Sequence, residues 1–393
     1  MGFDFDTVYE RRGSNSLKWD FAKENHHAED ELPLWVADMD FRSPKPLSDA
    51  VSDVAKKGFF GYTQDKDEDR EIVSGWLSRR HGYRPDPDWI LFSPGVVFGL
   101  TMAMLSCTDE GDAVMISEPV YYPFFSLVLD NKRKLVRNVL ISENGHYGID
   151  FDLFEKQIKD NDVKIYILCS PHNPVGRVWT KEELVRIGDI CIRNGVTVFS
   201  DEIHADFVYE DNKHIPFASI SEEFERSSLT FTSPSKTFNM AGLQIAEMSV
   251  GDKALRNKIR RTMSGIGYAE IPVTGLAAMR AAYTECDDWV DALVSYIHGN
   301  IIFMEDFIRD ELGMLGMTHP EGTYLPWVDC RGLGLERKEL EDLVRNEAKL
   351  WLDAGYIFGD SGNGWQRFNA ACPRKILEEA LVRFKDAIKR LDN

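Results

Sequence analysis

The sequence reads Leu229-Thr230-Phe231-Thr232-Ser233-Pro234-Ser235-Lys236-Thr237-Phe238 at the point that decides its fold. A short apolar run that is closed by a proline and small hydroxyl residues predicts a buried strand followed by a turn. Lys236 then stands at the carboxyl end of that strand. A solvated surface lysine is the ordinary alternative for such a position, so its meaning depends on what else lies nearby.

Two further apolar runs upstream also end in polar side chains. The run Val196–Ser200 leads to Asp201, and the run Lys164–Cys169 leads through Ser170-Pro171-His172 to Asn173. The carboxyl ends of parallel strands meet at one edge of a sheet, where ligands bind. We therefore expect an amide, a carboxylate and an amine to converge there. These groups can hold and use pyridoxal 5′-phosphate (PLP), although Asp201 alone is equally well read as a helix cap.

A phosphate site is predicted at Ser93-Pro94-Gly95-Val96-Val97, between the strand Ile90–Phe92 and a helix over Phe98–Cys107. A glycine at such a junction lets backbone N–H groups approach a phosphate at the start of a helix. Ser233 and Ser235 could add hydroxyl donors to the same phosphate. Taken alone, the stretch also fits a plain strand–helix turn, because it contains no complete glycine-rich phosphate motif.

Aromatic and cationic side chains complete the candidate site. Tyr121 and Tyr122 follow the strand Ala113–Ile116 and could stack on a pyridine ring, with packing at the edge of the core as the alternative. Arg367 lies in the apolar strand Trp365–Asn369. A buried arginine needs an anionic partner, and that partner is either a substrate carboxylate or an internal Asp or Glu.

Strands and helices alternate along most of the chain, which predicts an α/β doubly wound sheet. The sequence from Ala254 to about Glu311 has a helical pattern, and two more helices are expected over Lys338–Ala354 and Arg374–Leu391. We predict a seven-stranded, predominantly parallel sheet with a smaller α+β domain. The predicted division is an N-terminal arm that forms part of the small domain (1–45), a large cofactor-binding domain (46–285) and a C-terminal small domain (286–393).

Composition excludes several classes of function. The 393 residues carry a formal net charge of −19, which disfavours nucleic acid and anionic membranes as partners. No apolar run is long enough to cross a bilayer, and the N-terminus lacks the pattern of a signal peptide. Six cysteines without CxxC pairs fit reduced thiols in a cytoplasm and give no sign of a metal site. We expect a cytoplasmic protein.

The motifs together resemble fold-type I PLP enzymes, the aspartate aminotransferase superfamily (class I/II). Within it, the chain is most similar to the MalY/PatB group of cysteine–sulfur β-lyases, which includes cystathionine β-lyases and cystalysin-like enzymes. The superfamily resemblance rests on Ser93-Pro94-Gly95, Asn173-Pro174-x-Gly176, Asp201, Ser233-x-Ser235-Lys236, Gly242 and Arg367. The group resemblance rests on Leu34–Phe41, Glu118–Phe124, Asp201–His204, His214–Ser219 and Ser233–Leu243.

The resemblance implies a role for each candidate residue. Lys236 bonds to the cofactor aldehyde and then moves the Cα proton of the substrate, and Lys236 or a nearby tyrosine, Tyr121 or Tyr122, protonates the leaving group. Arg367 binds the substrate α-carboxylate, with Ala37 and Tyr122 beside it. Tyr62 reaches the phosphate from the neighbouring subunit of a homodimer. The remaining cofactor-binding residues that it implies are Asp201, Asn173, Tyr121, Gly95, Val96, Val97, Ser233, Ser235 and His204.

Two positions depart from the aminotransferase pattern. His204 stands where aminotransferases typically have a tyrosine, and Gln244 stands where many have a phosphate-binding arginine. Both departures favour the lyase group, although His204 could equally be a packing residue. The resemblance thus implies α,β-elimination on L-cystathionine or a related S-substituted cysteine. An aminotransferase is the alternative, and a regulatory binding protein on the same fold is a third.

Overall fold

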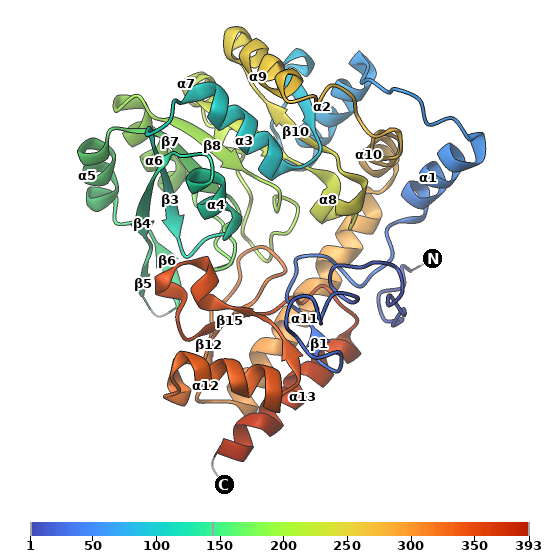
Figure 1. Cartoon of the computed structure of the whole chain (residues 1–393), viewed down its shortest axis with the longest axis vertical. Coiled ribbons are helices and arrows are strands. Elements are labelled where there is room, and N and C mark those ends of the chain that lie inside the picture. The colour runs from blue at the N-terminus through green and yellow to red at the C-terminus, as the bar shows by residue number, and fades with distance from the viewer. Residues whose placement is uncertain (1, 144, 392–393) are drawn as a thin grey trace.

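The computed structural model describes residues 2–143 and 145–391, and its centre is a seven-stranded sheet (Figure 1). In spatial order its strands are β2 (Ile90–Ser93), β10 (Ala246–Ser249), β9 (Ser228–Thr232), β8 (Thr197–Asp201), β7 (Val163–Cys169), β3 (Ala113–Glu118) and β4 (Lys134–Val139). Only β10 runs antiparallel to its two neighbours in this sheet. The predicted α/β fold with a predominantly parallel seven-stranded sheet is confirmed.

Alternation along β7 shows why the sheet is covered on both faces. Tyr166 and Leu168 pack into one apolar core, while Ile165 and Ile167 pack into another, because successive side chains of a strand point to opposite faces. Helices α5 (Phe151–Asn161), α6 (Lys181–Arg193) and α7 (Glu222–Arg226) contribute to the first core. Helices α3 (Val96–Cys107), α4 (Pro123–Leu129) and α9 (Lys253–Gly265) contribute to the second.

The remaining helices lie beside the sheet or, in the C-terminal part of the chain, below it (Figure 1). They are α1 (Lys45–Lys57), α2 (Asp67–His81), α8 (Pro234–Thr237), α10 (Val273–Glu285), α11 (Asp287–Glu311), α12 (Arg337–Asp342) and α13 (Arg374–Leu391). The segment predicted to be helical from Ala254 to about Glu311 therefore forms three helices, α9 to α11. The break between α9 and α10 includes Gly267 in a left-handed conformation (φ 85°), which favours glycine.

A four-stranded antiparallel sheet lies in the C-terminal part of the chain. Its strands are, in order, β11 (Gly316–Met317), β12 (Trp327–Asp329), β15 (Trp365–Arg367) and β14 (Asp353–Ala354). Two small two-stranded pairings are β1 (Leu32–Pro33) with β13 (Leu350–Trp351), and β5 (Ile141–Glu143) with β6 (His146–Gly148). The division of the chain into three parts stays a prediction.

The helix expected over Lys338–Ala354 is too long. Helix α12 continues as one π-helical turn to Glu347, and Lys349 then takes a left-handed conformation (φ 54°), which ends the helix. The chain continues as β13, parallel to β1 of the N-terminal arm, and as β14. Pairing of β13 with the distant β1, and of β14 with the nearby β15, therefore overrides the local helical pattern.

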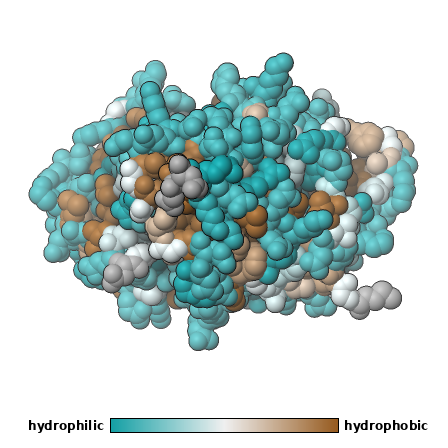
Figure 2. All heavy atoms as spheres, turned by 90° about the horizontal axis from the view of Figure 1, so that it is seen from below, coloured by the Kyte–Doolittle hydropathy of each residue, from teal (hydrophilic) through white to brown (hydrophobic). Residues whose placement is uncertain are grey.

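The face of the molecule shown in Figure 2 is mostly hydrophilic, with hydrophobic residues in separate patches. Among the described helices, none is long and apolar enough to cross a membrane. Within residues 2–143 and 145–391, no cluster of three His, Cys, Asp or Glu side chains has the arrangement of a metal site.

Candidate active site

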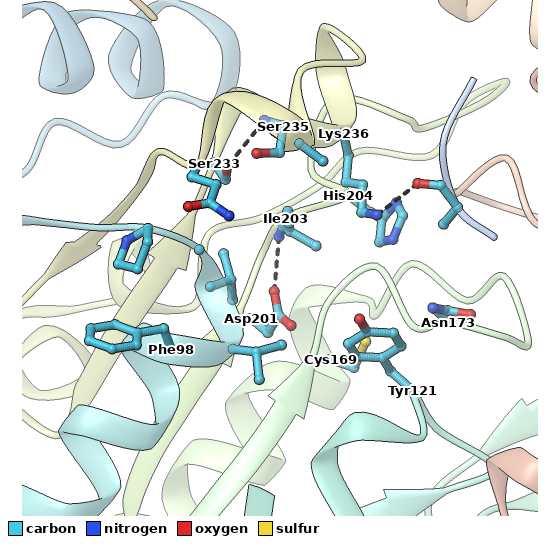
Figure 3. Close-up of a pocket in the computed structure, with 17 residues that line it drawn as sticks. Phe98, Tyr121, Cys169, Asn173, Asp201, Ile203, His204, Ser233, Ser235 and Lys236 are labelled. Carbon is cyan, nitrogen blue, oxygen red and sulfur yellow. Dashed lines mark hydrogen bonds between the residues drawn. The ribbon is translucent and has the colours of Figure 1, made fainter. Parts of the chain in front are cut away.

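The carboxyl ends of the parallel strands surround a cavity of about 360 Å³. Figure 3 shows Lys236, Asp201 and Tyr121 on different walls of this one space. The predicted residues that line it are Ala37, Gly95, Val96, Val97, Tyr121, Asn173, Asp201, His204, Ser233, Ser235 and Lys236. Pro94 of the predicted phosphate site and Gln244, noted above as a departure, also line it, together with four residues that the sequence did not single out: Phe98, Cys169, Ile203 and Ala241.

Lys236 reaches into the cavity from the short helix α8, which directly follows β9. Its Nζ donates a hydrogen bond of 2.7 Å to the carbonyl of Ala37, as drawn in Figure 3. Burial lowers the pKa of Lys236 to about 8, with the Arg367 guanidinium adding to the effect against the carboxylates Asp38 and Asp201. A neutral amine, the form that attacks a carbonyl, is therefore much easier to reach here than on the protein surface.

Asp201 ends β8 and is only 4 % exposed. Its Oδ1 accepts a 3.2 Å hydrogen bond from the backbone N–H of Ile203. Burial raises the pKa of Asp201 to about 7, against the opposing influence of Lys236. A cationic group in the cavity would restore the ionised form of this carboxyl. The wall at β8 is therefore suited to a protonated ring nitrogen.

The opposite wall is the N-terminus of α3, a helix of 12 residues. Gly95 is its N-cap and has no side chain to bond the first free N–H groups. No atom of the described residues lies within 4 Å of a Cβ built on Gly95, so a larger residue would fill the space in front of the helix. The backbone N–H groups there suit an anion.

The two serines differ in what their hydroxyls do. Ser233 donates to the carbonyl of Ile245 at 2.8 Å and accepts from the N–H of Ser235 at 3.0 Å. Its single hydroxyl proton is therefore already used within the protein. Ser235 lies 3.5 Å from the same carbonyl, a weaker contact, so it is the more available donor. A phosphate contact from Ser233 stays a prediction.

Arg367 lies beside the cavity on β15 and is 2 % exposed. Its guanidinium donates to Asn173 Oδ1 at 3.0 Å and to the carbonyl of Trp35 at 2.7 Å. It also forms an ion pair with Asp353 of β14, whose pKa burial raises to about 6 despite the arginine. Of the two anionic partners considered for Arg367, the internal carboxylate is thus present. Its other contacts join β15 to the loop after β7, through Asn173, and to the N-terminal arm, through Trp35.

The aromatic candidates lie at different distances from the cavity. The ring of Tyr121 lines the cavity, while Tyr122 packs against it with 5.6 Å between ring centroids and faces Phe358. Burial raises the pKa of Tyr121 above its ordinary value. Tyr62 does not line the cavity and is 95 % exposed, between α1 and α2. The structure therefore brings Tyr121 to the site within one chain but leaves Tyr62 outside it.

His204 occupies the loop after β8 with its ring against Tyr324, at 5.6 Å between centroids. Burial, with help from Lys236 and Arg367, lowers its pKa well below the ordinary value, so the ring is neutral at pH 7. Its Nδ1 is buried without a hydrogen-bond partner among the described residues. A neutral ring facing the cavity fits either a cofactor contact or packing, the two alternatives left open above.

Sequence reasoning missed Tyr324 and Asp353. The Tyr324 hydroxyl donates to the carbonyl of Ala37 at 3.1 Å, next to the bond from Lys236, and Asp353 neutralises Arg367. Both stand in short segments without a recognisable motif. The only signal for Asp353 was the apolar strand around Arg367, which called for a carboxylate without showing where it lies in the sequence.

Comparison with known proteins agrees with this site. Residues 36–384 match the sequence model of the family described as aminotransferase class I and II. The chain is 40% identical over 385 residues to cystathionine beta-lyase PatB of Bacillus subtilis (strain 168), covering 98% of this chain and 100% of that protein. It is 31% identical to protein MalY of Escherichia coli (strain K12), covering 98% and 99%. The crystal structure of cystalysin from Treponema denticola superposes with a TM-score of 0.96 at 36% identity, covering 100% of both chains.

The cystalysin structure contains a pyridoxal 5′-phosphate cofactor, and the cavity described above fits the same group. It offers an amine of lowered pKa at Lys236, a buried carboxyl that lacks a close cation at Asp201, and open helical N–H groups behind Gly95. An aldehyde, a protonated pyridine and a phosphate are the matching parts of PLP. PLP is therefore the cofactor, and the residues of this cavity fit it.

Proposed function

This chain belongs to the aminotransferase class I and II family of PLP-dependent enzymes, and from that membership and its site we propose that it is a carbon–sulfur β-lyase. Its substrate is L-cystathionine or a related S-substituted cysteine. The Cα–H and Cβ–S bonds break, the thiol leaves, and the remaining aminoacrylate is hydrolysed to pyruvate and ammonia. The observation that carries the proposal is 40% identity to a protein named cystathionine beta-lyase over nearly the whole chain, with an apt residue at each wall of the cavity.

Each wall then has one task. When bound, PLP supplies an electron sink for the bonds at the substrate Cα. Asp201 keeps the ring nitrogen protonated, because a buried carboxylate without an ion-pair partner favours a cation beside it. Asn173 accepts from Arg367 through Oδ1, which leaves its NH₂ group to donate to the ring hydroxyl. Tyr121 and His204 would contact the ring, while Gly95, Val96, Val97, Ser233 and Ser235 would hold the phosphate.

Arg367 orients the substrate. Its guanidinium is held by Asn173, Asp353 and the Trp35 carbonyl, so its position is set before an amino acid arrives. These contacts use both Nη2 donors and one Nη1 donor, and Nε is buried without a partner among the described residues. The remaining N–H donors are therefore free to bind a carboxylate. The backbone at Ala37 and the ring of Tyr122 border the place where the α-carboxylate lies. This fixes the Cα–H bond within reach of Lys236, which contributes to rate through orientation.

Lys236 moves the proton. With its pKa near 8, a useful fraction of Nζ is neutral at physiological pH and can take the proton from the substrate Cα. The same nitrogen, or the hydroxyl of Tyr121 or Tyr122, then protonates the departing sulfur. The raised pKa of each tyrosine keeps these hydroxyls protonated and able to donate.

A homodimer with shared sites belongs to the same proposal. Phe59, Phe60 and Tyr62 are 84 %, 66 % and 95 % exposed on the segment that joins α1 to α2, which reaches outward from the body of the molecule in Figure 1. Exposed aromatic side chains in one segment favour burial against a partner, and Tyr62 would then reach the partner's phosphate. The absence of disulfides among the six described cysteines supports a cytoplasmic location.

The experiment is product analysis with the PLP-loaded protein and L-cystathionine, with no keto acid added. We expect pyruvate, ammonia and homocysteine in many turnovers per active site. The matched control is Lys236→Ala, which should release no pyruvate and lose the yellow absorbance of lysine-bound cofactor. Bleaching of one equivalent, reversed by a keto acid, would instead establish the alternative, an aminotransferase.

A further inference from the structure

A buried carboxylate lies behind Lys236, on the side away from the cofactor cavity. Asp206 belongs to the loop after β8, and its side chain is 6 % exposed. Its Oδ2 accepts a 2.7 Å hydrogen bond from the hydroxyl of Thr237, the residue next to Lys236 on α8. Thr237 is itself 1 % exposed. A short bond from a hydroxyl to an ionised carboxylate is among the stronger hydrogen bonds of proteins.

Helix α2 keeps this carboxylate ionised. His81 Nε2 lies 3.1 Å and Arg80 Nε 3.7 Å from Asp206 Oδ1. Burial opposes ionisation, but His81, Thr237 and Arg80 together lower the pKa of Asp206 below its ordinary value. The same helix packs Trp76 against Phe238, with 5.5 Å between ring centroids. Helix α2 therefore contacts the α8 turn directly at Phe238 and, through Asp206, at Thr237.

The geometry of α8 explains why this contact bears on Lys236. Neighbouring side chains on a helix point in directions about 100° apart, so Thr237 can be anchored inward while Lys236 extends into the cavity. Lys236 has a long, flexible side chain, and its Nζ must meet both the cofactor and the substrate Cα. Asp206 also lies on the loop that begins at Asp201. The end of β8 and the loop that follows it thus supply both Asp201, which would hold the cofactor ring, and Asp206, which contacts the lysine turn.

We propose that Asp206 is a positioning residue that, through the Thr237 hydroxyl, fixes Lys236 relative to the cofactor and the substrate Cα. The inference rests on the proposed function for the identity of the reaction. The placement of Lys236 can be tested without the proposed function, because the spectroscopic signal of the bound cofactor also reports it. A merely structural role would change stability without changing the cofactor signal or the turnover number.

The test compares Thr237→Val, which removes the hydroxyl at nearly constant volume, with Thr237→Ser, which restores it. On PLP-loaded protein, Thr237→Val should lower kcat about 10- to 100-fold, the size of effect that a small misplacement produces, with KM within about threefold. Its visible circular dichroism should change as well. Thr237→Ser should recover both readouts, and Asp206→Asn should reproduce the loss, without adding to that of Thr237→Val.

The matched control is Thr230→Val on β9. The Thr230 hydroxyl is buried without a hydrogen-bond partner among the described residues, so its removal should leave kcat and the cofactor signal unchanged. The inference is overturned if Thr237→Val keeps wild-type kcat and circular dichroism. If Thr237→Val does not fold, Asp206→Asn decides by the same readouts, and failure of both to fold also overturns it. If the wild-type protein releases no pyruvate but Thr237→Val still changes the circular dichroism of the bound cofactor, only the lyase proposal is refuted.

Discussion

The site has two walls that are built in different ways. At the edge of the seven-stranded sheet, side chains such as Asn173, Asp201 and Lys236 project from the ends of strands. On the facing wall, the arm contributes backbone: the carbonyls of Trp35 and Ala37 accept from Arg367 and Lys236, each at 2.7 Å. A side chain can be recognised from its letter in the sequence, whereas a carbonyl cannot, because every residue has one.

The arm is held in place by buried charge. Asp40 is 7 % exposed and accepts from Lys18, Arg11 and Trp19 at 2.8, 2.7 and 2.9 Å. Burial opposes its ionisation, but these partners lower the pKa of Asp40 below its ordinary value. Trp35 adds a ring stack on Trp351 of β13, with 4.5 Å between centroids. The arm is thus fixed by its own contacts before the cavity is filled.

Arg367 joins the two walls, and its loss should have the largest effect. Arg367→Ala removes the carboxylate-binding group and leaves Asp353 buried without its cation. We expect kcat/KM for L-cystathionine to fall about 100- to 1,000-fold, mostly through KM. Arg367→Lys should recover only part of this, because an ammonium cannot replace the two-pronged guanidinium.

The control for Arg367 is the affinity for PLP, measured by cofactor fluorescence quenching or absorbance titration. It should stay within about threefold, since the arginine is assigned to the substrate rather than the cofactor. Equal losses in substrate and PLP affinity would show that the arginine mainly holds the two walls together.

The contrast between the walls also marks how far the sequence could predict the molecule. Strand ends and their polar side chains were predictable, because parallel strands share one edge and Lys236, Asp201 and Asn173 each follow an apolar run. The partner of Arg367 was not, because Asp353 lies in a segment with a helical pattern that instead becomes a strand by pairing with β15. The hydrogen bond from Ser233 to the carbonyl of Ile245 could not be predicted either, because it depends on the pairing of β9 with β10.

Asp201 offers a test of the side-chain wall that needs no substrate. Its pKa is about 7 in the folded protein and should be near its ordinary value when unfolded. Between about pH 4 and pH 7 the folded state therefore binds more protons than the unfolded state, so stability falls as pH rises through this window. Asp201→Asn cannot ionise. Its stability relative to wild type should rise across the window by about 2–4 kcal/mol.

The measurement is urea unfolding of the cofactor-free proteins between about pH 4.5 and pH 7.5, a range that spans the expected titration. Lys236 is common to both proteins, and its lowered pKa of about 8 changes stability mainly above this range. A constant difference between Asp201→Asn and wild type at every pH would mean that the buried carboxyl already has a cationic partner.

The smallest effect should come from loosening the arm. Trp351 is 5 % exposed and stacks on both Trp35 and His27, with 4.5 and 4.2 Å between ring centroids. Trp351→Leu removes the stack, so the Trp35 carbonyl should hold Arg367 less firmly. We expect KM to rise about three- to tenfold with kcat little changed, because a positioning contact outside the reacting groups is weakened. Trp351→Phe, which keeps a ring to stack, should lie between the two. If kcat falls while KM stays constant, the arm acts on Lys236 through Ala37 instead, and the backbone wall serves proton transfer more than substrate binding.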